Sequence, residues 1–353
     1  GGERQAPQMR PDDQPRQGRQ ARPALRQRSA QRRAFGEIEM QPEANAAGER
    51  REQRRAGRPV HAVDEAGQRG DAATAGHLPA HDVLFVDARF ALNQPGGRDP
   101  GKGDQDYALS HVPGAVRADL DRDLADMATP SQGRGRHPLP SAASFSAWLS
   151  RAGWRPDVQV VVYDAAGGSL AAARFWWLAR LSGIDNVAVL DGGWPAWLAE
   201  GLPTDNVLPL REPTTVHAVF DEAGTVNADE LAEGVASGRL LLLDARAAPR
   251  YRGEVEPLDP VAGHVPGARN RPFSENLDAE GRFRSPEELA RAFKATIAPH
   301  PAEDVVHMCG SGVTACHNLL AMEYAGLCGS RLYAPSWSGW VSDPSRAVAT
   351  GEG

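Results

Sequence analysis

The stretch DVVHMCGSGVTACHNLLAMEYAG, residues 304–326, decides the fold of this 353-residue chain. It opens with a short apolar run, continues through a loop of small residues, and closes with a helix-like segment from about Thr314. A short uninterrupted apolar run is typical of a strand buried in a parallel sheet. The stretch therefore predicts a strand, a tight loop and a helix, with Cys309 at the carboxyl end of the strand.

The same order of elements occurs twice along the chain, which indicates an internal repeat. The matched segments are HDVLFVDAR (81–89) with GRLLLLDAR (238–246), SHVPGAV (110–116) with GHVPGAR (263–269), the helix-like stretches 140–153 and 285–297, the apolar runs 158–164 and 304–309, and the closing segments 187–197 and 331–340. Apolar runs that alternate with helical patterns predict parallel sheets. We therefore expect an α/β protein of two domains, each a mainly parallel sheet flanked by helices.

Composition divides the chain into four parts. Residues 1–75 alternate Arg, Gln, Ala and Gly without apolar periodicity, which predicts a disordered Arg-rich tail. An RNA-binding or targeting arm is the alternative, although aromatic residues are scarce there, and a third possibility is that this segment is no natural part of the folded protein. We expect a first domain at 76–202, a Pro-rich linker at 203–224, and a second domain at 225–346.

Overall composition narrows the class of protein. Hydrophobic residues make up 41% of the chain and charged residues 24%, and the formal net charge is −7. The acidic body argues against nucleic acid as a partner, and no apolar stretch is long enough for a membrane span or a signal peptide. Three cysteines cannot build a disulfide framework for the whole chain. These features predict a cytoplasmic protein.

Cys309 is the candidate nucleophile. A thiol at the carboxyl edge of a parallel sheet, before a glycine loop and a helix N-terminus, meets inward-pointing amides and the positive end of the helix dipole. Both favour the thiolate, which is the reactive form of cysteine. The alternative is a small buried hydrophobe. The matching position of the first copy holds Asp164, so only the second copy carries a thiol there.

Other readings of this loop fit the sequence less well. A phosphate-binding P-loop would need Gly-Lys-Ser/Thr, which is missing. A cysteine phosphatase would need Arg six residues after the nucleophile, where Ala315 stands. Cys309, Cys316, His317 and Cys328 lack the paired spacing of zinc ligands, so we expect no metal and no cofactor.

The duplicated order of Asp-Ala-Arg, Gly-His-Val-Pro-Gly-Ala, Cys-Gly-Ser-Gly-Val-Thr-Ala and Ser-Trp-Ser-Gly-Trp resembles the tandem-domain rhodanese family of sulfurtransferases over roughly residues 80–345. The resemblance implies a catalytically silent first domain and a persulfide on Cys309, with the substrate site in the cleft between the domains. The sulfur would then pass to a thiol, cyanide or a thioredoxin-like reductant. The main-chain amides of the loop would bind the anionic sulfur, at Gly310, Gly312, Val313 and Thr314.

The resemblance also bears on the sulfur donor. Members of the family that use thiosulfate resemble Cys-Arg-Lys-Gly in this loop, whereas the neutral Gly310 and Ser311 favour 3-mercaptopyruvate. Arg250 matches the family's substrate-binding arginine and could grip a carboxylate. The second arginine of many mercaptopyruvate enzymes falls on Asp259, with Arg252 as a substitute. A thiosulfate:cyanide sulfurtransferase, or a persulfide relay with little small-molecule turnover, stays open.

The resemblance implies a proton relay through Ser311 with a His and an Asp from the first domain. His111, in the SHVPG motif, is the candidate for this histidine. The alternative is a structural role, which it would share with His264 in the second copy. No particular Asp can be chosen. Side chains that recur in both copies are expected to stabilise the fold, and we expect Cys316 and Cys328 to be inert. The recurring residues are Asp87, Arg89, Asp244 and Arg246, with Trp194, Trp197, Trp337 and Trp340.

Overall fold

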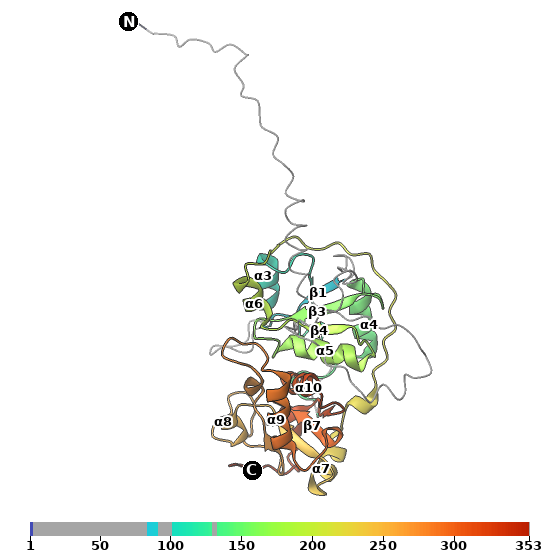
Figure 1. The fold of residues 1–353 in the computed structure, drawn as a ribbon, viewed down its shortest axis with the longest axis vertical. Coiled ribbons are helices and arrows are strands. Elements are labelled where there is room, and N and C mark those ends of the chain that lie inside the picture. Colours follow the sequence, from blue (N-terminus) through green and yellow to red (C-terminus); the bar gives the residue numbers. More distant parts are fainter. Residues whose placement is uncertain (3–82, 91–100, 129–132, 353) are drawn as a thin grey trace.

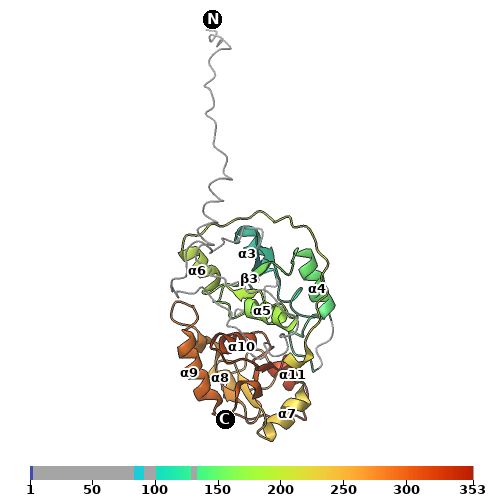
Figure 2. The ribbon, with the colours of Figure 1, turned by 45° about the vertical axis from the view of Figure 1, so that its right-hand side comes forward.

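The computed structural model describes residues 1–2, 83–90, 101–128 and 133–352 of the chain (Figure 1). Apart from Gly1 and Gly2, the expected tail of residues 1–75 lies outside the described residues. Below, the first half is the described chain up to residue 202, and the second half is the chain from residue 225 onward. In Figures 1 and 2 the two halves lie against each other, with helix α5 of the first facing helix α10 of the second.

The first half is a four-stranded parallel sheet with the strand order β2-β1-β3-β4. Its strands are β1 (Val83–Asp87), β2 (Val116–Arg117), β3 (Gln159–Tyr163) and β4 (Val187–Val189), and its helices are α3 (Lys102–Leu109), α4 (Ala142–Arg151), α5 (Ala171–Leu181) and α6 (Gly193–Ala199). Every residue of β1 and β3 is buried, because helices cover both faces of the sheet.

The second half repeats this arrangement with the strand order β6-β5-β7-β8, again all parallel. Its strands are β5 (Leu241–Asp244), β6 (Arg269–Asn270), β7 (Val305–Met308) and β8 (Arg331–Leu332). Its helices are α7 (Ala228–Ala236), α8 (Ala248–Tyr251), α9 (Pro286–Ile297), α10 (Ala315–Tyr324) and α11 (Ser336–Trp340), with short 3-10 turns at Glu222–Gly224, Phe273–Asn276 and Ala302–Asp304. The expected fold class, two parallel sheets flanked by helices, is confirmed.

Local sequence explains where two of the expected helices, α4 and α9, begin. Ser141 caps α4 by accepting a hydrogen bond from the amide of Ser144. Ser285 and Glu288 form the reciprocal capping box that starts α9. Both helices lie within one or two residues of the expected bounds. Helices α3 and α7 were not expected, because neither segment has a matched pattern in both copies.

The interface between the halves has an apolar core. One continuous core cluster contains Phe175 and Trp176 of α5 together with Cys316 and Leu319 of α10. The expected linker runs beside α4, where Thr214 and Ala218 donate main-chain hydrogen bonds to residues of that helix. The halves are therefore packed as one unit, and side chains from both can meet at the carboxyl edge of β7.

Candidate active site

Cys309 lies directly after β7, where a parallel sheet presents its carboxyl end. Its side chain is 2% exposed. Its main chain is fixed on both sides, since its amide donates to Ser336 Oγ at 3.1 Å and its carbonyl accepts from the amide of Trp337 at 3.0 Å. The amide of Gly312 donates to Cys309 Sγ at 3.2 Å. The expected contact between loop amide and sulfur is present at Gly312.

Gly312 can make this contact because it has no side chain. Its φ is +80°, and a Cβ there would lie 2.3 Å from the carbonyl oxygen of Ala334. Of the other loop residues expected to bind substrate, Gly310 lies beside two guanidinium groups, Val313 is buried in the shared core, and Thr314 directly precedes α10 without a side-chain capping hydrogen bond. Ser311, between the two glycines, has a buried side chain.

The matching loop of the first half shows how this turn holds an anion. The buried carboxylate of Asp164 accepts four main-chain hydrogen bonds, from Ala166 and Gly168 on Oδ1 and from Leu170 and Ala172 on Oδ2, at 2.8–3.2 Å. Burial raises the pKa of Asp164, and these four hydrogen bonds oppose the shift. A loop of this kind therefore satisfies an anionic group two bonds beyond Cβ.

Ser311 meets a histidine of the first half. Its Oγ lies 2.8 Å from Nδ1 of His137, and Nε2 of His137 lies 3.5 Å from Oδ1 of Asp121. A proton on Nε2, facing the carboxylate, leaves Nδ1 as an acceptor for the Ser311 hydroxyl. The three side chains form a Ser-His-Asp series that crosses between the halves.

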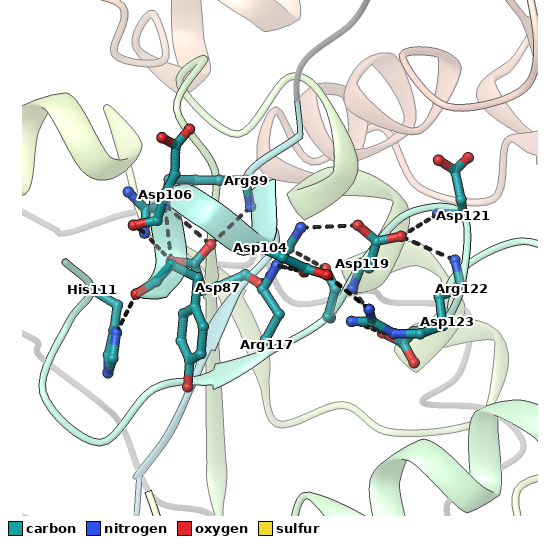
Figure 3. Close-up of polar contacts among 12 residues, drawn as sticks. Asp87, Arg89, Asp104, Asp106, His111, Arg117, Asp119, Asp121, Arg122 and Asp123 are labelled. Atoms are coloured by element: carbon teal, nitrogen blue, oxygen red, sulfur yellow. Dashed lines mark hydrogen bonds and ion pairs between the residues drawn. The ribbon is translucent and has the colours of Figure 1, made fainter. Parts of the chain in front are cut away.

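A network of ion pairs holds the segment that carries Asp121. Arg117 pairs with Asp119 and with Asp104, in each case at 3.0 Å. The amide of Asp121 donates to Asp119 at 3.0 Å, and the amide of Asp119 donates to Asp123 at 2.8 Å. In Figure 3 these residues form a cluster from which the carboxylate of Asp121 points away. The network therefore positions Asp121 beside His137.

The expected pairing of His111 with Ser311 is not found. His111 stacks on Tyr107 at 4.1 Å, and its Nδ1 lies 2.7 Å from the carbonyl oxygen of that residue. Its twin His264 stacks on Tyr251 at 3.9 Å with the same carbonyl contact at 2.8 Å. In Figure 3, His111 lies at the opposite end of the polar network from Asp121. The motif histidine is structural in both copies, and His137 takes the place beside Ser311.

Arg250 lies on α8, next to the loop. It donates to Glu256 Oε1 at 2.7 Å and lies 3.4 Å from Asp259 Oδ2. Arg136 of the first half forms an ion pair with the other oxygen of Asp259. Arg252 turns instead to Glu254 at 2.7 Å, on the surface. The second cation near Arg250 is therefore Arg136, which the sequence did not single out.

Arg174 of α5 reaches into the active-site loop from the first half. It is fully buried, and it donates to the carbonyl of Gly312 at 3.0 Å and to the carbonyl of His137 at 3.3 Å. Burial lowers the pKa of this guanidinium, and nearby Cys316 and Cys309 oppose the shift. Burial raises the pKa of the Cys316 thiol to about 12, so this second thiol stays protonated.

The recurring residues have the same contacts in both halves. Arg89 pairs with Asp87 at 2.7 Å and covers the ring of Trp194, while Arg246 pairs with Asp244 at 2.6 Å and covers the ring of Trp337. Trp197 and Trp340 pack in the cores of their own halves. Contacts that also occur in the half without the thiol belong to the fold, as expected.

In the described ranges, no three His, Cys, Asp or Glu side chains are grouped so that they could hold a metal ion. Among these same residues, no helix has the length and apolarity that a membrane crossing requires.

Comparisons with known proteins agree with this geometry. The model of the rhodanese-like domain matches residues 73–200 and 227–343. A Pseudomonas aeruginosa protein named probable 3-mercaptopyruvate sulfurtransferase is 46% identical over 79% of this chain and 96% of its own length. The thiosulfate sulfurtransferase of Bos taurus is 35% identical over 73% of this chain and 86% of its own length.

Solved structures give the same result. The 3-mercaptopyruvate sulfurtransferase from Leishmania major is 31% identical, with a TM-score of 0.63 over 73% of this chain and 70% of its own. SseA from Escherichia coli is 30% identical, with a TM-score of 0.62 over 73% of this chain and 94% of its own. The chain therefore belongs to the rhodanese family, with one rhodanese-like domain in each half.

Proposed function

We propose that this chain is a sulfurtransferase that moves sulfur from 3-mercaptopyruvate to a thiol or cyanide through a persulfide on Cys309. The observation that carries the proposal is the pair of matching loops. The first binds the Asp164 carboxylate through four amides, and the second presents Cys309 to the amide of Gly312. The outer sulfur of a persulfide lies two bonds beyond Cβ, as the carboxylate oxygens of Asp164 do. The loop that suits one anion is therefore suited to the other.

The first step transfers sulfur to the enzyme. The Cys309 thiolate attacks the donor's sulfur, an S–S bond forms, and the donor's C–S bond breaks. Its electron pair passes to the carbon beside the ketone and leaves the enolate of pyruvate. The enolate takes a proton and becomes pyruvate. We assign the transfer of this proton to Ser311 and His137: the donor's thiol loses its proton to His137 Nδ1 through the Ser311 hydroxyl, 2.8 Å away, and the same hydroxyl returns the proton to the enolate.

The second step releases the sulfur. The acceptor attacks the outer sulfur of the persulfide, the S–S bond breaks, and its electron pair returns to Cys309 as the thiolate. This is covalent catalysis in two half-reactions. We propose a thiol acceptor, such as a thioredoxin-like reductant. We also propose that the reaction takes place in the cytoplasm, because free thiols are typical of that compartment and Cys309, Cys316 and Cys328 are all free.

Intact-mass measurement tests the persulfide. After treatment with 3-mercaptopyruvate, the wild-type chain and Cys316→Ser should each gain the mass of one sulfur atom, and Cys309→Ser should gain none. Cys309→Ser should also lose kcat/KM by about 10³-fold or more, because it removes the covalent route. Added sulfur on Cys309→Ser would disprove the mechanism. A higher kcat/KM for thiosulfate than for 3-mercaptopyruvate would disprove the donor.

A further inference from the structure

Ser336 has an unusual backbone conformation beside the reactive cysteine. Its φ is +54°, and in the described parts of the chain no other residue except glycine has a positive φ. The left-handed region crowds any residue that carries a Cβ, and such conformations persist only where the surrounding structure holds them. Ser336 is also fully buried, at the start of α11. The backbone at this position therefore favours glycine over serine.

The first half has glycine at the matching position. Gly193 has φ +58°, and its amide donates to the carbonyl of Leu190 at 3.0 Å. The amide of Ser336 donates to the carbonyl of Tyr333 in the same way, at 3.1 Å. A Cβ on Gly193 would lie 2.4 Å from the carbonyl oxygen of Asp164. Both halves thus contain this turn, and the turn of the second half has room for a side chain.

The hydroxyl of Ser336 binds the main chain of Cys309. It donates to the carbonyl of Tyr333 at 3.1 Å, so its oxygen is left to accept the amide of Cys309, also at 3.1 Å. Without this oxygen, the amide of a buried residue would lose its acceptor. The amide of Trp337 donates to the Cys309 carbonyl at 3.0 Å. Two consecutive residues of one turn therefore fix the peptide groups on both sides of Cys309.

Asp164 and Cys309 are held in different ways. The carboxylate of Asp164 accepts four loop amides, which fix that residue through its side chain. Cys309 Sγ accepts the amide of Gly312 at 3.2 Å. A sulfur that must attack a donor and then carry a second sulfur cannot be fixed by its own bonds to the loop, so its place depends on the main chain. The Ser336 hydroxyl supplies a main-chain contact of this kind.

We propose that Ser336 is a positioning residue: its hydroxyl binds the amide of Cys309 and thereby sets where Sγ lies relative to the amides of the loop. Serine occupies a position that favours glycine because only a side chain can reach this amide. The inference rests on the proposed function and deepens it, since it assigns part of the placement of the nucleophile to a residue outside the Cys309 loop.

Two variants of Ser336 separate positioning from a purely structural role. Ser336→Ala and Ser336→Gly both remove the hydroxyl, so both should lower kcat with 3-mercaptopyruvate by the same factor, about 5- to 20-fold, and leave KM within about twofold. Ser336→Gly should nevertheless have a Tm about 2–4 °C above that of Ser336→Ala, because glycine adopts the left-handed region freely. Activity should thus follow the hydroxyl, whereas stability follows the backbone. Ser237→Ala is the matched control and should have the wild-type kcat, since it removes an exposed hydroxyl that donates to the carbonyl of Glu233 at 2.8 Å.

Alkylation of Cys309 by iodoacetamide, followed by peptide mass, gives a readout that needs no sulfur transfer. Its rate should fall at least threefold in both Ser336 variants, because the sulfur moves away from the amide that stabilises the thiolate. If wild type takes up no sulfur from 3-mercaptopyruvate, the proposed function fails while this rate still tests Ser336. If Ser336→Ala does not fold, Ser336→Gly decides alone. The inference is overturned if Ser336→Gly keeps the wild-type kcat and alkylation rate, whether or not Ser336→Ala loses them.

Discussion

Two glycines on either side of Ser311 decide which groups reach Cys309. Gly312 has φ +80° and brings its amide to the sulfur, and Gly310 leaves room for Arg136 and Arg250. The first makes the loop an anion binder, and the second places cations over it. The reactivity of the thiol therefore depends on side chains that are missing as well as on those that are present.

A buried histidine lies close to the site without taking part in it. His307 is in the middle of β7, and neither of its ring nitrogens has a hydrogen-bond partner among the described residues. Burial lowers its pKa to about 3. The position that matches it in the first half holds Val162, because both residues lie one place before the last residue of their strands.

His307 should make the protein sensitive to acid. In the unfolded chain the pKa of His307 is near 6.5. Between about pH 6.5 and pH 3, the unfolded state therefore binds a proton that the folded state does not bind. The free energy of unfolding then falls by about 1.4 kcal/mol per pH unit. His307→Val removes this loss, so its advantage over wild type should be about 2 kcal/mol greater at pH 5 than at pH 8. Urea unfolding at both pH values measures it. His217→Val, at an exposed position, is the control, and an equal advantage at both pH values would contradict the prediction.

The sequence predicts Cys309 as the nucleophile, but it does not predict the neighbours that the other half contributes. Cys309, its glycines and Arg250 lie within short motifs whose local geometry determines their place. His137, Asp121 and Arg136 come from a segment with no twin in the second copy, and His137 is 174 residues away from its partner Ser311. The resemblance to the rhodanese family implied His111, whereas the recurrence of its motif at His264 indicated the structural role that the contacts of both histidines support.

At the level of elements, both halves contain a strand, a loop and a helix in the same order, with Asp164 at the start of the first loop and Cys309 at the start of the second. The amides of Trp194 and Trp337 donate to the carbonyls of Asp164 and Cys309 respectively, at 2.8 and 3.0 Å. The helix follows the Asp164 loop at Ala171 and the Cys309 loop at Ala315. In the first half, the Asp164 carboxylate thus occupies the place where the main-chain amides of the loop bind an anion.

Removing that carboxylate should destabilise the first half. Asp164→Ala leaves four buried amides without their acceptor, which should lower the free energy of unfolding by about 2–4 kcal/mol. Asp157→Ala, at an exposed residue of the same half, should change it by less than about 0.5 kcal/mol. Chemical denaturation gives both values. Equal stability of the two variants would show that the amides do not depend on this carboxylate.

Elements with matched patterns were predictable, and those without were not. Apolar runs predict the buried strands, and the capping box predicts where α9 begins. Helix α3 is a mostly polar segment that contacts the core through Tyr107, so its sequence gives little periodic signal. Its existence depends on tertiary packing, which a single sequence does not display.

At the level of the whole molecule, α5 and α10 make the interface, and Arg174 crosses it. This guanidinium has no acidic partner among the described residues, and its contacts are the carbonyls of Gly312 and His137 and the thiol of Cys316. One side chain thus holds both the loop of the second half and the histidine of the first. It also brings a buried positive charge toward the reactive sulfur.

Arg174 should therefore act as a positioning residue. Arg174→Met should lower kcat/KM on the order of 10- to 100-fold, because the loop and His137 lose a shared anchor. Arg174→Lys should recover part of this loss, because it keeps the positive charge and can still donate to a carbonyl. Arg180→Met, on the same helix but paired with Glu323 away from the loop, should stay within twofold of wild type. An unchanged kcat/KM in Arg174→Met, or no recovery in Arg174→Lys, would assign this residue to packing alone.

The duplication and its two sheets could be read from the sequence, whereas the way the halves meet could not. Repeated motifs indicate which strands and helices form within each domain. The contacts of Arg174, His137 and Arg136 each occur once, because they join nonequivalent faces of the two halves. No repeated pattern in the sequence therefore predicts them.

The series from Asp121 through His137 to Ser311 has one more consequence. The first half, which has Asp164 where the second has Cys309, contributes His137 and Asp121 to the surroundings of Ser311 in the second half. Amino-acid changes in the half without this cysteine can thus alter turnover. Surveys of natural variants that score only the thiol-bearing domain would overlook them.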